Sequence, residues 1–294
     1  MEYYLCFDIG GTSIKYGIWE PERGFLMTDE KPTPAKKGGS EIVSVMKKTG
    51  DELVKLYPVA GICISTAGMV DCEKGIITYA SPLISDYAGT RLKEEMESYF
   101  QLPCEVENDV NCAGLAECHA GVACGYSSAL CVTVGTGIGA AILLDGKVLH
   151  GACGNAGEVG YMHLPGGALQ DIAAASVLVS EVESAMGLPH GSIDGKWVFD
   201  HADTGDIICL SAIEKMADIL SMGIANICYV LNPQIVVLGG GILAREERLL
   251  PLVHRGLKKY LISAIAENTR VKAARNGNRA GMIGAWFHFR ERRF

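Results

Sequence analysis

Short apolar runs broken by glycines and polar turns dominate the first hundred residues of the chain. Runs of about four to eight residues rich in β-branched and aromatic side chains are typical of strands, and longer amphipathic stretches are typical of helices. The pattern predicts strands at 3–9, 13–19, 24–30, 59–65 and 104–107 and helices at 40–56 and 90–100. These elements form one α/β unit.

The same order of elements begins again in the second half of the chain. Strands are predicted at 129–134, 140–144, 147–150 and 234–238, with helices over most of 171–231, from about 242, and over 280–292. We therefore expect two lobes, an N-terminal lobe at 1–110 that the C-terminal segment 280–294 completes, and a C-terminal lobe at 111–279.

Charge and composition exclude several classes of protein. The 294 residues carry a net charge of -8, which argues against a surface for nucleic acid. No apolar run approaches the roughly 20 residues that span a bilayer, and no signal-peptide pattern opens the chain, so we expect a cytoplasmic protein that has no membrane partner. Several of the 11 cysteines lie inside apolar runs, which predicts free thiols.

The segment from Asp8 to Lys15, between the first two strands, predicts a phosphate-binding hairpin. Gly10 and Gly11 are expected to turn with positive φ and to bring backbone N–H groups close to an anion, with Thr12 as a hydroxyl donor and Lys15 as a nearby positive charge. A Walker loop or a dinucleotide fingerprint would need a helix after the glycines, whereas strand pattern continues here. The alternative is an ordinary hairpin whose glycines serve only the turn.

Two further glycine clusters follow strands in the second half of the chain. Gly135-Thr136-Gly137 joins two strands, as the first hairpin does, and Gly239-Gly240-Gly241 lies between a strand and a helix. A strand followed by glycines and a helix is a second kind of nucleotide platform.

These elements resemble those of the ROK family of bacterial sugar kinases, within the actin-like ATPase and hexokinase-type superfamily. The resemblance rests on the segments 8–15, 107–111, 157–160 and 233–241 and runs through nearly the whole chain. It implies an α/β, two-lobed, actin-like ATPase (ribonuclease H-like) fold, in which each lobe is a mixed β-sheet with flanking helices and the active site lies in the interlobe cleft. ATP, Mg²⁺ and a small-molecule sugar are the implied ligands, and a homodimer is implied as well.

The resemblance also assigns roles to individual residues. Asp8 would hold Mg²⁺ through water, and the nucleotide would contact the glycine clusters and their neighbours, namely Asp8, Gly10, Gly11, Thr12, Lys15, Gly135, Thr136, Gly137, Gly239, Gly240 and Gly241. Asp109 would be the catalytic base that removes the proton of the sugar hydroxyl. By local pattern alone, Asp109 could instead cap the helix that follows it.

The sugar would be bound by Asn108, Glu158, Gly68 and Tyr161. Asn108 offers both a donor and an acceptor, and Glu158 lies in a glycine-rich loop that can approach a ligand. The alternatives are a solvated loop carboxylate for Glu158 and an ordinary packed side chain for Tyr161. Ala67 stands where the family usually has proline before Gly68, which makes this loop less rigid.

The family usually has histidine, a ligand of a structural Zn²⁺, at the position of Tyr161. The segment 162–184 contains no cysteine and no cysteines in the chain are spaced Cys-x-x-Cys, so we expect no zinc. His163 is a poor replacement ligand because a lone histidine is more often a surface residue.

We therefore expect an ATP-dependent kinase that transfers the γ-phosphoryl group to a hydroxyl of a hexose or hexosyl glycoside. The zinc-less variant at Tyr161 resembles the β-glucoside kinases, while a glucokinase and an N-acetylmannosamine kinase remain alternatives. A sugar-binding sensor that has lost catalysis is the alternative from another class. DNA-binding repressors of the family carry a helical domain before the sugar-binding fold, and this chain begins almost directly with the Asp8 strand.

Overall fold

A computed structural model describes residues 2–294 of the chain, which divides into two compact units. Among the described residues, the first unit is built from 2–120, 147–156 and 278–294, and the second from 121–146 and 157–277. The bounds proposed from the sequence, 1–110 with 280–294 and 111–279, stay a prediction.

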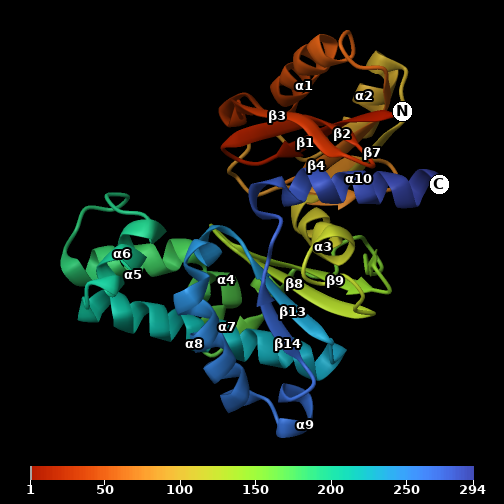
Figure 1. Ribbon diagram of the computed structural model, residues 1–294. Coiled ribbons are helices and arrows are strands. Elements are labelled where there is room, and N and C mark those ends of the chain that lie inside the picture. The colour runs from red at the N-terminus through yellow and green to blue at the C-terminus, as the bar shows by residue number, and fades with distance from the viewer. Residues whose placement is uncertain (1) are drawn as a thin grey trace. The chain divides into compact units, whose positions relative to one another are not determined.

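The first unit is an α/β unit around one five-stranded sheet (Figure 1). Its elements are β1 (Tyr3–Ile9), β2 (Ser13–Glu20), β3 (Gly24–Pro32), η1 (Ala35–Lys37), α1 (Gly39–Leu53), β4 (Val59–Thr66), β5 (Met69–Asp71), β6 (Ile76–Tyr79), α2 (Leu92–Phe100), β7 (Cys104–Asn108), α3 (Asp109–Ala120), β10 (Lys147–Val148) and α10 (Ala280–Arg293), which the turn η4 (Gly277–Arg279) precedes. The strand order is β3-β2-β1-β4-β7, and β5 and β6 form a separate hairpin.

The direction of the strands brings polar residues to one edge of this sheet. β1 pairs antiparallel with β2 but parallel with β4, and β4 pairs parallel with β7. The register sets Asp8 opposite Ser65 and Thr66 opposite Asn108. The carboxyl ends of three adjacent parallel strands therefore lie side by side, which is where α/β sheets bind ligands.

Helix α10 packs unusually closely on this sheet. It contacts β1, β4, β7 and α3, and Figure 1 shows α10 and α3 on one face of the sheet with α1 and α2 on the other. A Cβ atom on Gly284 would lie 1.8 Å from the carbonyl oxygen of Cys112 in α3, and one on Gly61 of β4 would lie 2.4 Å from the ring of Phe289. Glycine at these two positions is what lets the helix approach the backbone of its neighbours.

The second unit repeats the arrangement of a hairpin beside parallel strands. Its elements are β8 (Ser128–Val134), β9 (Ile138–Leu144), η2 (Val159–Tyr161), β11 (His163–Leu164), β12 (Gly167–Ala168), α4 (Leu169–Ala173), α5 (Ala175–Met186), α6 (Gly195–Asp203), α7 (Ile207–Leu231), β13 (Ile235–Gly239), η3 (Gly241–Arg245), α8 (Glu246–Tyr260), α9 (Ser263–Ala266) and β14 (Arg270–Ala273). Four strands of its sheet lie in the order β9-β8-β13-β14, where β8 and β9 are antiparallel and β8, β13 and β14 are parallel.

The long helix α7 organises the core of the second unit. It contacts α4, α5, α6 and α8 and contributes buried apolar side chains such as Ile213, Leu220 and Ile224. Gly223 lets α4 approach, because a Cβ atom there would lie 2.9 Å from the side chain of Leu169. The core of the first unit is separate and is formed around residues such as Phe7, Ile64 and Met46.

Most predicted elements are present, with differences at their ends and in short strands. The helix expected from about 242 begins as the 3-10 turn η3, and regular α-helix starts only at Glu246. The sequence pattern missed β5, β6, β11, β12 and β14, which are two to four residues long. All eleven cysteines are free, as expected. Among residues 2–294, none of the helices combines the length and apolar character that crossing a membrane requires.

Candidate functional site

The hairpin between β1 and β2 is held by its neighbours in the first unit. Its turn is closed by a hydrogen bond from the backbone N–H of Gly10 to the carbonyl of Ser13 at 3.0 Å. Thr33 secures it from the side, since its hydroxyl donates to the carbonyl of Gly10 at 2.6 Å and its N–H donates to the carbonyl of Thr12 at 2.9 Å. The loop is therefore a fixed element of the sheet edge.

The expected backbone geometry of this hairpin is wrong in one respect. Neither Gly10 nor Gly11 has a positive φ. A Cβ atom on Gly11 would make only ordinary contact, at 3.8 Å from Cβ of Leu83, and one on Gly10 would lie 3.4 Å from the carbonyl oxygen of Ser13. The fold itself therefore does not demand glycine at position 11.

Asp8 lies at the end of β1, next to this hairpin, with its side chain only 16% exposed. Oδ1 accepts a hydrogen bond from the hydroxyl of Ser65 at 2.7 Å, and Oδ2 lies 3.6 Å from Nζ of Lys15. Burial raises the pKa of the Asp8 carboxyl, and the Ser65 hydrogen bond and the Lys15 charge offset this effect in part. A carboxylate held in this way fits the preference of Mg²⁺ for oxygen ligands.

Asn108 and Asp109 mark the junction of β7 and α3. The side-chain oxygen of Asn108 accepts hydrogen bonds from the backbone N–H groups of Val110 at 2.9 Å and Asn111 at 3.1 Å. Its amide donates to the carbonyl of Gly68 at 2.9 Å and to Oδ1 of Asp109 at 3.0 Å. Asn108 therefore caps α3, the role that was the alternative for Asp109. These four hydrogen bonds use both donors and both acceptor positions of the Asn108 side chain.

Asp109 is half-buried at the first turn of α3. Its Oδ1 accepts hydrogen bonds from the amide of Asn108 and from the backbone N–H of Val110 at 2.9 Å. Two donors on one oxygen, together with the partial positive charge of the helix N-terminus, favour the ionised form of a carboxylate. A fixed, ionised carboxylate at a sheet edge can act as a general base.

The fold of the first unit requires glycine at position 68, one of the predicted sugar-binding residues. Its φ is +96°, and a Cβ atom would lie 2.7 Å from the carbonyl oxygen of Tyr79. The loop after β4 thereby presses against the β5–β6 hairpin, and its carbonyl receives the Asn108 amide. A hydrogen bond from the Ala67 N–H to the carbonyl of Ile9, at 2.9 Å, joins the same loop to the end of β1.

Directly before Asn108, the buried Glu107 collects several polar groups. Oε2 lies 2.6 Å from Nε2 of His150 and 3.4 Å from Nδ1 of His288. Oε1 accepts from the Asn108 N–H at 2.7 Å and from the Asn111 amide at 3.1 Å. Although burial raises the pKa of Glu107, the His150 hydrogen bond and the two imidazoles outweigh it and lower the pKa to about 2.

In the second unit, the hairpin between β8 and β9 contains Gly135, Thr136 and Gly137. The N–H of Gly135 donates to the carbonyl of Gly137 at 2.9 Å. The first turn of α5 holds the loop, because the Ala175 N–H donates to the carbonyl of Gly135 at 2.9 Å and the Ser176 hydroxyl to that of Thr136 at 2.7 Å. The N-terminus of a twelve-residue helix therefore meets a glycine hairpin, an arrangement suited to an anion.

The third glycine cluster follows β13, which pairs parallel with β8. Gly240 has a φ of +94°, and a Cβ atom there would lie 2.2 Å from the carbonyl oxygen of Val134, so the fold requires this glycine. By contrast, no described atom lies within 4 Å of a Cβ atom placed on Gly135 or Gly241. These two glycines border open space.

A cavity of about 750 Å³ in the second unit opens beside these loops. Of the predicted residues, Gly135, Thr136 and Gly241 line it. Sequence reasoning missed the rest of its wall, which comes from α5, the loop before α6, α6 itself and η3. This part of the wall includes Ser176, Val179, Glu183, Ile193, Phe199 and Arg245. A mixed apolar and polar cavity of this size suits a nucleotide-sized ligand.

Glu183 is the buried carboxylate of that wall. Its Oε1 accepts from the N–H groups of Ser192 at 2.9 Å and Ile193 at 3.3 Å, and its Oε2 lies 3.2 Å from Nδ1 of the exposed His190. Although burial raises the pKa of Glu183, the backbone hydrogen bonds outweigh it and lower the pKa. The carboxylate therefore fixes the loop that forms one side of the cavity.

Glu158 directly precedes the turn η2 of the second unit, and Tyr161 is the last residue of that turn. Glycine at positions 157 and 160 lets this turn pack closely on β9. A Cβ atom on Gly157 would lie 2.0 Å from the carbonyl oxygen of Ala140, and one on Gly160 would lie 2.2 Å from that of Ile138. Burial raises the pKa of the Glu158 carboxyl. Tyr161 is 48% exposed.

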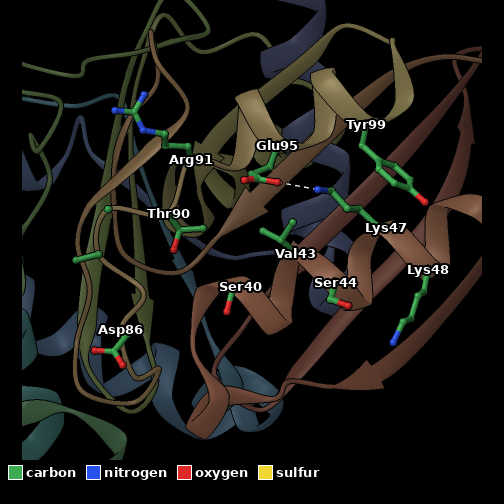
Figure 2. A pocket seen from close by; sticks show the side chains of 12 residues that line it. Ser40, Val43, Ser44, Lys47, Lys48, Asp86, Thr90, Arg91, Glu95 and Tyr99 are labelled. Atoms are coloured by element: carbon green, nitrogen blue, oxygen red, sulfur yellow. Dashed lines mark hydrogen bonds and ion pairs between the residues drawn. The ribbon is translucent and has the colours of Figure 1, made fainter.

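A second hollow, of about 700 Å³, lies between α1 and α2 of the first unit. Figure 2 shows Ser40, Val43 and Ser44 of α1 facing it, with the ammonium of Lys47 directed at Glu95 of α2. This ion pair measures 2.7 Å. None of the predicted site residues lines this hollow, and it is no part of the candidate site.

The model of the ROK family matches residues 4–292. The chain belongs to the ROK family. The resemblance stated from the sequence and the two-lobed actin-like ATPase fold expected from it are both confirmed.

Several ROK proteins are similar over their whole length. A β-glucoside kinase of Listeria innocua is 33% identical over 97% of this chain and 96% of its own, and a glucokinase of Halalkalibacterium halodurans is 30% identical over 96% and 93%. Among solved structures, a ROK family glucokinase from Streptomyces griseus in complex with glucose and AMPPNP superimposes with a TM-score of 0.85 at 27% identity, covering 98% of this chain and 99% of that one.

Within each unit of this ROK protein, the structure brings most of the predicted residues together. In the first unit, Asp8, the 10–12 hairpin, Gly68, Asn108 and Asp109 share the carboxyl edge of the sheet. In the second unit, Gly135–Gly137 and Gly239–Gly241 share another such edge. Glu107 belongs to the segment 107–111 on which the family resemblance rests. No sequence signal pointed to its partners His150 and His288.

Proposed function

We propose that this protein transfers the γ-phosphoryl group of ATP to a hydroxyl of a hexose or hexosyl glycoside. The chain is a carbohydrate kinase, as its ROK membership and its kinase relatives support. The observation that carries the proposal is the placement of Asp109. Its carboxylate is oriented by hydrogen bonds, and it lies at the same edge of the sheet as the hairpin that follows Asp8.

The nucleotide site is supported by glycines that the fold does not need. Gly11, Gly135 and Gly241 all leave room for a Cβ atom, yet each lies in a loop at the carboxyl end of a strand. A side chain at such a position would stand in the way of an approaching phosphate or adenosine. We propose that the phosphates contact the 10–12 and 135–137 hairpins, aided by Lys15. Adenosine would occupy the cavity that Gly241 lines, next to Gly239 and Gly240 in sequence.

Mg²⁺ is proposed to bind beside Asp8, whose carboxylate and Ser65 support suit an ion held through water. When bound, the ion would neutralise charge on the transferring phosphoryl group. Lys15 stays within 3.6 Å of Asp8 and would add a second positive charge for the phosphates.

Asp109 would accept the proton of the attacking sugar hydroxyl as the new P–O bond forms. Its hydrogen bonds to Asn108 and Val110 leave the carboxylate oriented before substrate arrives, which lowers the cost of reaching the transition state. We propose that Asn108, Gly68, Glu158 and Tyr161 orient the sugar. Because the polar atoms of Asn108 are already paired, its contact with sugar would require the exchange of one of these hydrogen bonds.

The favoured substrate is a β-glucoside, on the grounds of Tyr161 and of the β-glucoside kinase relative. Glucose and N-acetylmannosamine are the alternatives, and the glucokinase relatives keep glucose open. The exposed Tyr161 ring could stack on the second sugar of a disaccharide, a contact that free glucose would not make.

The deciding experiment is a coupled ADP-release assay with Mg-ATP and a panel of cellobiose, glucose, N-acetylmannosamine and fructose. Asp109→Asn is run beside the wild type. Turnover of one sugar that disappears in the variant supports the kinase and names its substrate. Sugar binding by calorimetry without turnover across the panel would overturn the proposal in favour of a sensor.

A further inference from the structure

Three metal-ligating side chains from distant parts of the sequence converge in the first unit. Cys72 follows β5, Glu107 lies in β7 directly before its last residue, and His288 lies in α10. One ligand atom of each lies within 4.8 Å of the other two. These three residues are called the Cys72 cluster below. Its member Glu107 lies two residues before Asp109 in the sequence.

The separations inside the Cys72 cluster are close to those of ligands around one ion. Sγ of Cys72 lies 3.3 Å from Oε1 of Glu107, and Nδ1 of His288 lies 3.4 Å from Oε2. Zinc bonds of about 2.0–2.3 Å at tetrahedral angles place neighbouring ligand atoms roughly 3.3–3.6 Å apart. Because these distances run to the two different oxygens of Glu107, the carboxylate would contact the ion between the sulfur and the nitrogen.

His288 is the buried imidazole of the cluster. Its side chain is only 4% exposed, and Nδ1 is the ring nitrogen that lies toward the carboxylate of Glu107. An ion bound at the cluster would therefore be coordinated through Nδ1.

We propose that the Cys72 cluster is a binding site for a divalent transition ion of the Zn²⁺ class. A thiolate, an imidazole and a carboxylate form the mixed donor set that Zn²⁺ accepts, and hard ions such as Mg²⁺ do not favour sulfur. On binding, the Cys72 thiol releases its proton to solvent, so one thiolate and one carboxylate balance the two positive charges. His150, hydrogen-bonded to Glu107 at 2.6 Å, orients the coordinating carboxylate from outside.

This ion would be structural and would act on the catalytic segment through Glu107. Glu107 also accepts the backbone N–H of Asn108, so fixing its carboxylate fixes the start of α3. The cluster lies far in sequence from 158–184, where the family's zinc ligands were sought. The expectation of a zinc-free chain considered only that segment and the spacing of cysteines, and the proposal departs from it.

The first test measures metal content. Full-length protein, purified without a metal-affinity column, is stripped with chelator, incubated with Zn²⁺, desalted and analysed by mass spectrometry for metal. We expect about one equivalent per wild-type chain, and at least about a tenfold weaker affinity in Cys72→Ser. The matched control is Cys153→Ser, an exposed cysteine outside the cluster, which should bind as the wild type does.

The second test does not depend on the variants folding. Co²⁺ added to the stripped wild type should give a thiolate-to-metal charge-transfer band, and Zn²⁺ should abolish this band by competition. Absence of the band together with substoichiometric zinc would overturn the proposal, as would equal zinc affinity in Cys72→Ser and Cys153→Ser. Loss of kinase activity on any sugar has no bearing on either readout, so failure of the proposed function is distinguishable.

Discussion

Gly281 of α10 lies so close to Asp8 of β1 that a Cβ atom at position 281 would meet the carboxylate oxygen Oδ1 at 2.4 Å. The same oxygen accepts the hydrogen bond from Ser65, so displacing the carboxylate would disturb this bond. A helix from the end of the sequence therefore sets the position of the carboxylate proposed to serve Mg²⁺.

We expect Gly281→Ala to impair catalysis more than folding. The added methyl group must displace the Asp8 carboxylate, which should lower kcat by about tenfold or more, whereas overpacking costs about 1–3 kcal/mol of stability. Steady-state kinetics at varied Mg²⁺ and thermal unfolding would measure both. Gly284→Ala is the matched comparison, since it crowds the Cys112 backbone in the same helix and should lower Tm while leaving Mg²⁺ dependence unchanged. Identical Mg²⁺ dependence in both variants would contradict the proposed role of Gly281.

Asp109→Asn should lower kcat by about 10²–10⁴-fold and change the KM for sugar much less. The amide keeps an oxygen that can accept the Val110 N–H but cannot take the proton of the sugar. Steady-state kinetics on the preferred sugar provide the measurement. Asp171→Asn, at an exposed position of α4, serves as the control. Turnover of the Asp109 variant within a few-fold of wild type would sink the assignment.

Adjacent glycines of the third cluster should respond in opposite ways to alanine. Gly241→Ala should raise the KM for ATP by roughly tenfold with Tm unchanged, because the methyl group enters open space beside the cavity. Gly240→Ala should instead destabilise the second unit by a few kcal/mol (about 2–4), because it combines a positive φ with a clash against Val134. ATP kinetics and denaturant unfolding distinguish the two, and a normal KM in a folded Gly241 variant would count against the adenosine site.

The Glu107–His150 pair predicts a pH dependence of stability in chelator-treated protein. The hydrogen bond to Glu107 raises the pKa of His150 above 6.5, so the stabilisation is fully present below pH 6.5 and is lost as pH rises through the folded-state pKa. Glu107, with a pKa near 2, stays ionised throughout this range. His150→Gln should therefore lower the free energy of unfolding by about 1 kcal/mol at pH 6 and by less at pH 9.

Urea unfolding at pH 6 and pH 9 checks this expectation. His163→Gln, an exposed histidine of the second unit, should give the same stability difference from wild type at both pH values. If the loss caused by His150→Gln is as large at pH 9 as at pH 6, the ion pair is not its origin.

The sequence predicted the sheets well because strands with buried faces have strong apolar patterns. β1, β4 and β8 read as continuous apolar runs, and the glycine hairpins that follow β1 and β8 marked two candidate phosphate-binding loops. Short pairs such as β11 and β12 have two residues each, too few to produce a period. Tertiary pairing alone defines them.

The sequence predicted the site residues that stand in contiguous motifs. It did not predict those that folding brings together from distant parts of the chain. Gly10, Asp109 and Gly135 stand in short segments with a recognisable order, whereas His150 and His288 approach Glu107 only after α10 has packed on the sheet. The prediction of a positive φ at Gly10 and Gly11 was wrong because glycine permits a positive φ but does not impose one.

The packing of α10 has a consequence for synthesis. Translation proceeds at about 5–20 residues per second, so α10 emerges on the order of ten seconds after α3, with which it packs in the first unit. Until then α3 is the only one of the two helices on that face, so the parts of β1 and β4 that α10 contacts are uncovered, and the nascent chain exposes apolar surface that invites chaperones or aggregation. The order in which the ribosome delivers the helices leaves this face of the first sheet incomplete until α10 has been made.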